Sequence, residues 1–297
     1  MEAPARGPDR LRDLPAGYFE WRAPPALRHA VACVWAQVTP PTAGRDSLVL
    51  PDGCSDLIWE RGRGAYVAGP DTGPVPTTLA AGRVVVGVRF RPSAGGPALG
   101  LPLSDLHDQR VDLADVRPGE ARQLSAGLPP DLAVARALGV AATLVAAGPP
   151  DPAVTQAARL LRDPAAYTED IAAELGLSPR QLRRRCQAAI GYGPKTLQRV
   201  LRFRRFVSRI DAVSSAPPPL PPASALAPAS ALPSASAFPS ALAFPPAPSR
   251  PSAAAPARLD LATLAADAGY ADQAHLTREC VQLSGLTPAA LARLRAV

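Results

Sequence analysis

The sequence has few of the residues that cross-link small domains or bind metals. Its 297 residues include four cysteines, Cys33, Cys54, Cys186 and Cys280, which stand far apart and form no Cys-x-x-Cys pair. A disulfide framework or a zinc site would need an organised cysteine pattern. The sequence therefore predicts neither, and we interpret the cysteines as small apolar residues.

Long hydrophobic runs are also missing. Residues 1–13 contain no apolar stretch of the kind that a secretory signal needs, and the longest apolar run, 134–148, is short for a bilayer span and includes Arg136. We therefore expect a cytoplasmic protein without a membrane partner. With 47% apolar residues, the chain can bury the cores of two or three domains.

Lysine is nearly absent, since Lys195 is the single one, and arginine carries the positive charge. Residues 1–150 hold 15 basic and 15 acidic side chains, whereas residues 151–297 hold 17 and 10, so the whole net charge of +7 lies in the second half. Residues 178–209 contain ten basic side chains and no acidic one. Such a one-sided run favours a phosphate-binding surface over an ordinary solvated face.

The first half contains short β-type runs from His29 to Arg91, separated by glycine and proline. They predict a small β-rich domain. Apolar residues then recur at helical spacing from Ser104 onward and from Asp131 to Gly148, which predicts a helical tail that connects this domain to the second half. The β-type runs are HAVACVWAQV, SLVL, SDLIWE, AYVAG, TTLAA and RVVVGVRFRP.

A pattern of residues occurs twice in the second half, with an offset of 94 positions. Each copy follows an Ala-x-x-x-Gly step, Ala172 to Gly176 and Ala265 to Gly269. This is the pattern of two helix-turn-helix units that read duplex DNA. The repeated residues are Leu182, Arg184, Cys186, Gly191, Pro194, Leu197 and Arg199, and then Leu276, Arg278, Cys280, Gly285, Pro288, Leu291 and Arg293.

Capping signals predict where the helices of both units begin and end. In the first unit, Thr168 is expected to cap one helix, Gly176 to end it, and Ser178-Pro179-Arg180-Gln181 to open the next with a capping box. A third helix is expected from about Pro194 to Ile210. In the second unit, the corresponding signals are Asp260, Gly269, Asp272 and Thr287-Pro288.

The segment between the two units differs in composition. Of the 44 residues in 214–257, 15 are alanine, 13 are proline and 9 are serine, and only Arg250 is charged. Proline removes backbone donors and fixes φ, so we predict a disordered tether rather than helix or sheet. A partner-docking role for its leucine and phenylalanine residues is an open alternative. We expect the second unit to dock against the first despite the tether, because closing such a loop costs on the order of 3 kcal/mol of chain entropy, which a packed contact between the units can offset.

The two units resemble the AraC/XylS family of bacterial transcription regulators. Residues 171–206 and 261–295 carry the resemblance, and the more specific copy reads GYADQAHLTR from Gly269, followed by GLTP from Gly285. Residues 50–59, LPDGCSDLIW, and 86–92, VGVRFRP, are similar to the sensor half of one branch of such regulators. The resemblance implies sequence-specific DNA binding that the N-terminal domain modulates.

The predicted fold class is α+β. The domains are an N-terminal mainly-β, sensor or dimerisation domain with a helical tail in 1–150, a first helix-turn-helix unit with its linker helix in 151–213, the disordered tether in 214–257 and the second unit in 258–297.

Two departures from the family pattern are visible. Cys186 and Cys280 stand where the family usually has an aromatic residue, so we expect less well filled cores beneath both recognition helices. The family also joins its units through one rigid helix, which places the recognition helices roughly 34 Å apart, one turn of DNA. In this chain that helix leads into the predicted tether.

First-turn residues of each recognition helix are predicted to read bases in the major groove. In the first unit these are Arg180, Arg183 and Arg184, since arginine pairs with guanine O6 and N7. In the second, Gln273 suits adenine, Ala274 and Thr277 suit the thymine methyl group, and Arg278 completes the face. Phosphate contact is the alternative role for each arginine and for Thr277, and a helix-surface role is a further alternative for Thr277 and Arg278.

Lys195, Arg199 and Arg202, on the helix after the first unit, are predicted to contact phosphates. Double-stranded DNA is the predicted partner, and RNA polymerase, a small-molecule effector and a second copy of the chain are further candidates. No cofactor and no metal is predicted.

An enzyme in the N-terminal domain is one rival interpretation. Its candidate groups, Asp52, Cys54, Asp56, Asp71 and His107, show no base partner at a defined spacing, so we predict no enzyme. A metal site from His29 and His107 lacks support for a similar reason. The second rival is a protein-interaction adaptor that uses the helical half and the tether.

Overall fold

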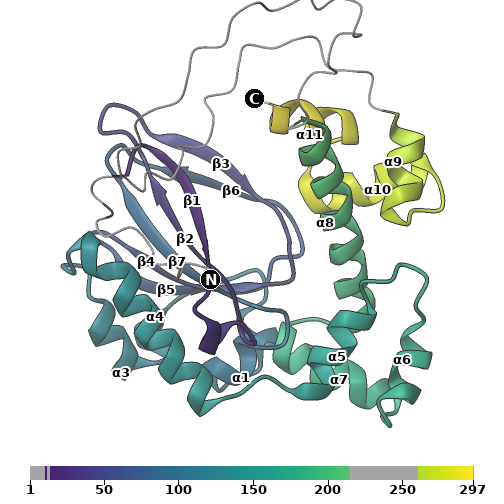
Figure 1. Ribbon diagram of the computed structural model, residues 1–297, viewed down its shortest axis with the longest axis horizontal. Helices are drawn as coiled ribbons and strands as arrows, with labels where there is room; N and C mark the ends of the chain where they lie inside the picture. Colours follow the sequence, from purple (N-terminus) through teal and green to yellow (C-terminus); the bar gives the residue numbers. More distant parts are fainter. Residues whose placement is uncertain (1–10, 12–13, 215–259, 297) are drawn as a thin grey trace, which may run out of the picture.

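A computed structural model describes residue 11 and residues 14–214 and 260–296. The predicted tether, residues 214–257, lies outside the described residues except for Ser214, so its disorder stays a prediction. The fold is α+β, as predicted: a β-rich N-terminal domain precedes a helical region (Figure 1).

The N-terminal domain is built on a six-stranded antiparallel sheet with the strand order β1-β2-β7-β4-β5-β8, accompanied by a separate ribbon of β3 and β6. The strands are β1 (Gly17–Arg22), β2 (Val31–Val38), β3 (Arg45–Val49), β4 (Ser55–Glu60), β5 (Gly64–Ala68), β6 (Val75–Leu79), β7 (Val84–Phe90) and β8 (Arg110–Asp112). Six of them coincide with the predicted β-type runs, and β1 and β8 were not predicted.

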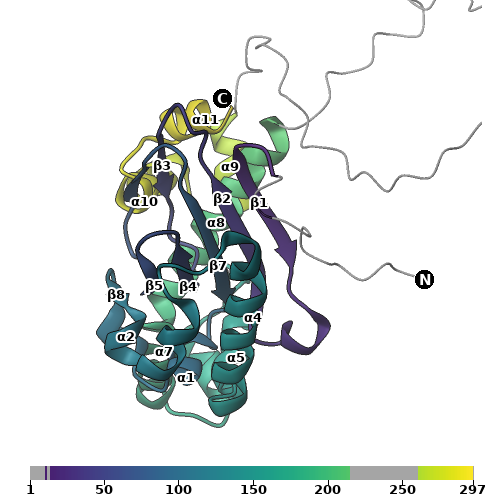
Figure 2. The same ribbon diagram turned by 90° about the vertical axis from the view of Figure 1, so that its left-hand side faces the viewer.

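The two faces of the six-stranded sheet have different neighbours. One face buries Val34, Leu57, Trp59 and Val86 in the main core of the domain, beneath α4 (Pro130–Ala147) (Figure 2). The opposite face carries a smaller cluster that includes Trp35. Since side chains alternate along a strand, neighbouring residues of β2 and β7 serve both faces.

Helix α4 is a covering helix of the sheet rather than only a connection to the second half. Its residues Ala137, Val140, Ala141 and Leu144 are fully or almost fully buried. Among the described residues, α4 is the one helix long and apolar enough to cross a membrane. The expectation of a run too short to span is corrected, because the helix begins at Pro130. Its apolar face packs against β7 and β4.

The helical half consists of α5 (Pro152–Leu160), α6 (Thr168–Glu174), α7 (Pro179–Ile190), α8 (Pro194–Ser214), α9 (Leu261–Ala268), α10 (Gln273–Ser284) and α11 (Pro288–Ala296). Short helical segments, η2 (Pro25–Leu27), α1 (Gly95–Leu99), η3 (Leu103–Leu106), α2 (Leu113–Val116), α3 (Pro118–Ala121) and η4 (Arg122–Leu124), complete the N-terminal domain.

Helix α8 joins the two units into one core. In Figure 1 it runs from α5 and α7 to α11, and it contacts α9 and α10 as well. A single buried cluster contains Leu182 and Phe203 of the first unit and its linker together with Leu264 and Leu276 of the second. The packing of the second unit against α8 confirms the expected docking.

Candidate nucleic-acid interface

A capping box begins helix α7 of the first unit. Ser178 Oγ accepts from the backbone N–H of Gln181 at 3.2 Å, and Gln181 Oε1 accepts from the backbone N–H of Ser178 at 2.8 Å, so the predicted capping box is confirmed. Gly176 adopts the left-handed conformation with φ +65°, and Ala172 is fully buried between the helices. Thr168 is wrong as a cap, because it is the first helical residue and is buried.

One face of α7 is buried and the other is exposed. Leu182, Cys186, Ala189 and Ile190 lie in the core, which fixes the rotation of the helix about its axis. The exposed face carries the three arginines predicted to read bases. These arginines are Arg180, Arg183 and Arg184. They line an open hollow of about 590 Å³ together with Ser178, Gln181 and Gln187.

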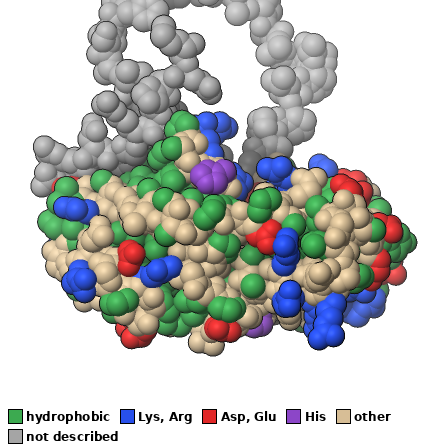
Figure 3. All heavy atoms as spheres, turned by 90° about the horizontal axis from the view of Figure 1, so that it is seen from below, with side chains coloured by type: hydrophobic (Ala, Val, Ile, Leu, Met, Phe, Trp, Pro, Cys, Tyr) green, Lys and Arg blue, Asp and Glu red, His purple; other side chains and the backbone are tan. Residues whose placement is uncertain are grey.

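The three arginines are free of acidic partners within the described chain. Their neighbour Arg185 differs, because it lies 3.5 Å from Asp151, the residue that caps α5. Figure 3 views the molecule from below and shows Lys and Arg side chains gathered on the side where α6 and α7 lie in Figure 1. Unpaired guanidinium groups on one helix face are available to phosphates or guanine edges.

The second unit repeats the frame with carboxylate caps. Asp260 accepts from the backbone N–H groups of Ala262 and Thr263, and Asp272 accepts from that of His275 at 2.6 Å. Gly269 has φ +88°. These three positions confirm the predicted starts and stop. The matching caps and turns make α10 the counterpart of α7.

The reading face predicted for α10 is exposed in large part. Gln273, Ala274 and Arg278 are exposed, and Thr277 is half-buried, with its hydroxyl donating to the carbonyl of Gln273 at 2.8 Å. Leu276 and Cys280 point into the core. Arg278 is the one basic side chain of this face, so the second unit offers far less positive charge than the first.

The residues predicted to contact phosphates have different surroundings. Lys195 is exposed. Arg199 and Arg202 instead hold Glu279 of α10, at 3.2 Å and 2.9 Å, and only 14% of the Arg202 side chain is exposed. These two arginines join the units, so a phosphate contact would have to compete with the carboxylate.

Helix α8 also sets the scale of the interface. Its 21 residues correspond to roughly 31 Å at 1.5 Å per residue. That length is close to the ~34 Å between successive major grooves on one face of DNA.

Polar contacts also join α8 to the second unit. Asp211, near the end of α8, pairs with Arg295 of α11 at 2.6 and 2.7 Å, and Arg205 donates to the carbonyl of Ala268.

The N-terminal domain packs against the turn that follows α7. This contact between the domains was not predicted from the sequence. Gly191 lies against Pro70 so closely that a Cβ would be 2.4 Å from the proline ring, and Gly53 lies against Leu197 and Tyr192. Both glycines have positive φ, 100° and 83°. The Gly191-Tyr192-Gly193 sequence was the available signal for a tight contact, but its partner came from the other domain.

Tyr192 lies at the centre of this junction. Its ring meets His107 edge-on, with centroids 6.1 Å apart, and burial holds its pKa above the usual range. Its hydroxyl is buried without a hydrogen-bond partner among the described residues, and Nε2 of His107 lies 3.3 Å from a carboxylate oxygen of Asp108. The junction therefore rests on shape and apolar contact more than on polar bonds.

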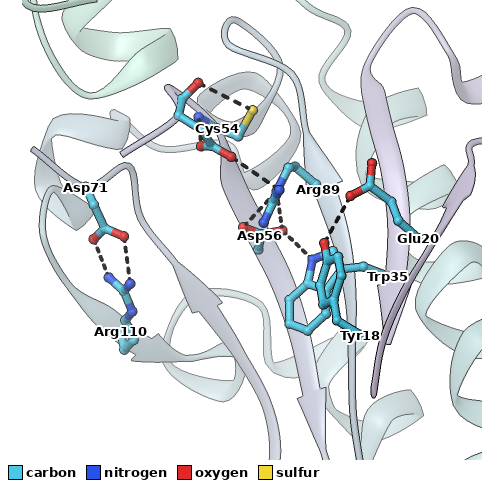
Figure 4. A network of polar contacts seen from close by, with 9 residues as sticks. Tyr18, Glu20, Trp35, Cys54, Asp56, Asp71, Arg89 and Arg110 are labelled. Carbon is cyan, nitrogen blue, oxygen red and sulfur yellow. Dashed lines mark hydrogen bonds and ion pairs between the residues drawn. The ribbon is translucent and has the colours of Figure 1, made fainter. Parts of the chain in front are cut away.

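The groups considered for catalysis are held in structural contacts (Figure 4). Arg89 lies 3.2 Å from Asp56 and 3.3 Å from Asp52, and the indole N–H of Trp35 donates to Asp56 at 2.8 Å. Burial raises the pKa of Asp56, although Arg89 opposes the shift. The indole lies flat over Gly87, where a Cβ would approach it within 2.1 Å.

The remaining candidates are similarly engaged. Asp71 accepts hydrogen bonds from Nη1 and Nη2 of Arg110, at 2.6 and 2.7 Å, as Figure 4 shows. Burial raises the pKa of the Cys54 thiol well above its usual range, which disfavours the reactive thiolate.

Fold and interface together define a two-domain α+β protein with paired helix-turn-helix units. Residues 20–112 match the model of a family described as a domain of unknown function, DUF6597. No curated protein matches the chain.

Several solved structures are similar to this chain at low sequence identity. ToxT from Vibrio cholerae O395 is 9% identical, with 85% of this chain and 98% of that chain covered and a TM-score of 0.39. Wild-type ToxT with bound unsaturated fatty acid, from Vibrio cholerae strain SCE256, is 10% identical, with 84% of this chain and 95% of that chain covered and a TM-score of 0.34. The AraC-like transcriptional activator CuxR is 16% identical, with 60% of this chain and 76% of that chain covered and a TM-score of 0.22.

Proposed function

We propose that the protein is a sequence-specific DNA-binding transcription regulator of the AraC type, which inserts α7 and α10 into successive major grooves. The observation that carries the proposal is the exposed face of α7, with three arginines free of acidic partners in the described chain. The length of α8 and the matched caps of the two units support the two-groove arrangement.

The exposed side chains suggest unequal half-sites. Arg180, Arg183 and Arg184 favour guanine in the first, and Gln273 with the methyl groups of Ala274 and Thr277 favours A·T pairs in the second. Arg278 completes the second reading face. Lys195 supplies a phosphate contact and hence salt dependence.

We infer that the N-terminal domain modulates this binding. Its loops contact the turn after α7 through Pro70 and Gly53, so a change in those loops would reach the first recognition helix. A small-molecule effector, RNA polymerase and a second copy of the chain are the partners we propose for regulation at a promoter. The arginine-paired carboxylates of the sheet support a structural rather than catalytic role for this domain.

Selection of the full-length protein on random duplexes tests the proposal. We expect enriched sites with a G-containing half-site and an A·T-rich half-site about one helical turn apart. Arg183→Ala should weaken binding to the enriched duplex about tenfold or more. Arg185→Ala is the matched control, because Arg185 pairs with Asp151 and should lose little. Absence of any enriched duplex would favour the protein-interaction adaptor.

A further inference from the structure

A buried carboxylate lies on the second recognition helix. Only 9% of the Glu279 side chain is exposed. Its Oε1 accepts from Arg202 Nη2 at 2.9 Å and from Arg199 Nε at 3.2 Å, and its Oε2 accepts from Arg202 Nε at 3.3 Å. The Nε2 atom of His275 lies 3.4 Å from Oε1. A carboxylate buried among two guanidinium groups is fixed in both position and direction.

The contacts of Glu279 connect α10 to α8, the helix that follows α7 of the first unit. Both arginines belong to α8, which begins directly after the three-residue turn that follows α7. Arg202 also lies over the ring of Tyr270 at 5.1 Å, and Arg199 donates to Gln282 at 2.6 Å. One turn of α8 is thereby held against one turn of α10 and against Tyr270, which precedes α10.

The same helix presents its reading face on the other side. Gln273, Ala274 and Arg278 are exposed, whereas Glu279 faces α8. Apolar side chains such as Leu276 and Phe203 already hold the units together, and apolar contacts alone tolerate small sliding and rotation. A bidentate ion pair adds direction more than stability. The carboxylate therefore limits the rotation of α10.

We propose that Glu279 is a positioning residue, which sets the rotation of α10 and its spacing from α7 and so fixes the half-site separation that the protein accepts. The inference rests on the proposed function. It assigns Arg199 and Arg202 to the joint between the units in place of the phosphate contacts predicted from the sequence.

Duplexes with altered spacing test the role of Glu279. The full-length wild-type protein should bind its selected site more tightly than the same site with five base pairs inserted between the half-sites. Glu279→Gln removes the charge and keeps the shape, and should reduce this discrimination about tenfold. Asp267→Asn is the matched control: it removes the same charge from an exposed position in the second unit and should leave the discrimination unchanged. Unchanged discrimination in Glu279→Gln overturns the proposal.

A measurement without DNA separates this inference from the proposed function. Spin labels at the exposed positions Ala188 and Ala274 report the separation of α7 and α10 in the full chain. We expect a narrow distance distribution in the wild type and in Asp267→Asn, and a clearly broader one in Glu279→Gln. Equal distributions would refute the positioning role. If Glu279→Gln does not fold, Arg202→Gln provides the test, because Arg199 remains to neutralise the carboxylate and a smaller broadening is expected.

Discussion

The two helix-turn-helix units share a backbone frame and differ in the use of charge. In the first, Ser178 caps the recognition helix and three arginines of α7 stand free of acidic partners in the described chain. In the second, Asp272 caps the recognition helix, the reading face has one basic side chain, and Glu279 is buried against arginines of the first unit's linker.

Under the proposed function, this difference divides two tasks between copies of one motif. Charge that points outward would supply affinity for the DNA backbone and for guanine, whereas charge that points inward would supply geometry. The first unit is therefore expected to dominate the free energy of DNA binding and the second to restrict where the complex forms.

Removing one arginine from each unit should give the largest contrast. Arg184→Ala is expected to weaken binding to the selected duplex by about tenfold to a hundredfold, from ~1–3 kcal/mol for a guanine contact. Arg278→Ala should cost only a few-fold, because its unit contributes little net charge. Titrations at one fixed salt concentration measure both, and equal losses would contradict the division of tasks.

The turn glycines offer a second, smaller contrast in the free energy of unfolding. Gly176→Ala places a side chain at φ +65° in open space, which should cost roughly 1–2 kcal/mol. Gly269→Ala meets the Pro164 ring at 2.4 Å in addition, and overpacking should raise the loss by roughly 1–3 kcal/mol. Urea denaturation of the two variants compares them directly.

A smaller loss for Gly269→Ala than for Gly176→Ala would show that the turn of α9 and α10 moves away from Pro164 at little cost. The second unit would then be less firmly docked than its contacts indicate.

The caps predict a small difference in the response to acid. Hydrogen bonds from Thr263 and from the backbone hold the pKa of Asp260 below its usual range. A lowered folded-state pKa means that the stabilisation is complete above the unfolded-state value of about 3.9 and is lost as the pH falls through the folded-state pKa. We therefore expect amide protection in α9 to fall in this range.

Asp260→Ser tests that expectation, because a serine cap does not titrate. Protection of the α9 amides, relative to their intrinsic exchange rate at each pH, should no longer fall below about pH 4 in the variant. Protection of α7, capped by Ser178, should be the same in both proteins. An unchanged acid response of α9 in the variant would assign the effect to other carboxylates.

Local rules predicted much of the fold. Caps and stops at Ser178, Asp260, Gly269 and Asp272 lie where the sequence places them, because each depends on residues within one turn. β1 was missed because an edge strand with half-buried alternation carries a weak signal. Thr168 was misassigned because threonine is common both as a cap and in the first turn.

Side-chain partners depended on contacts that span the chain. Arg199 and Arg202 had the same appearance in the sequence as the free arginines of α7, and Glu279 lies 77 positions after Arg202. No local pattern separates a solvated helix charge from one buried against another helix. The close contact between Pro70 and Gly191 was not predicted for the same reason, since it joins residues of two domains.

The docking of α9, α10 and α11 directly on α8 also bears on how such a chain can evolve. The ends of the segment between Ser214 and Asp260 belong to elements that contact each other, α8 and α9. Each doubling of a connection between such ends costs only about 0.6 kcal/mol of chain entropy. Insertions can therefore accumulate at this point under weak selection, while the recognition helices keep their alignment.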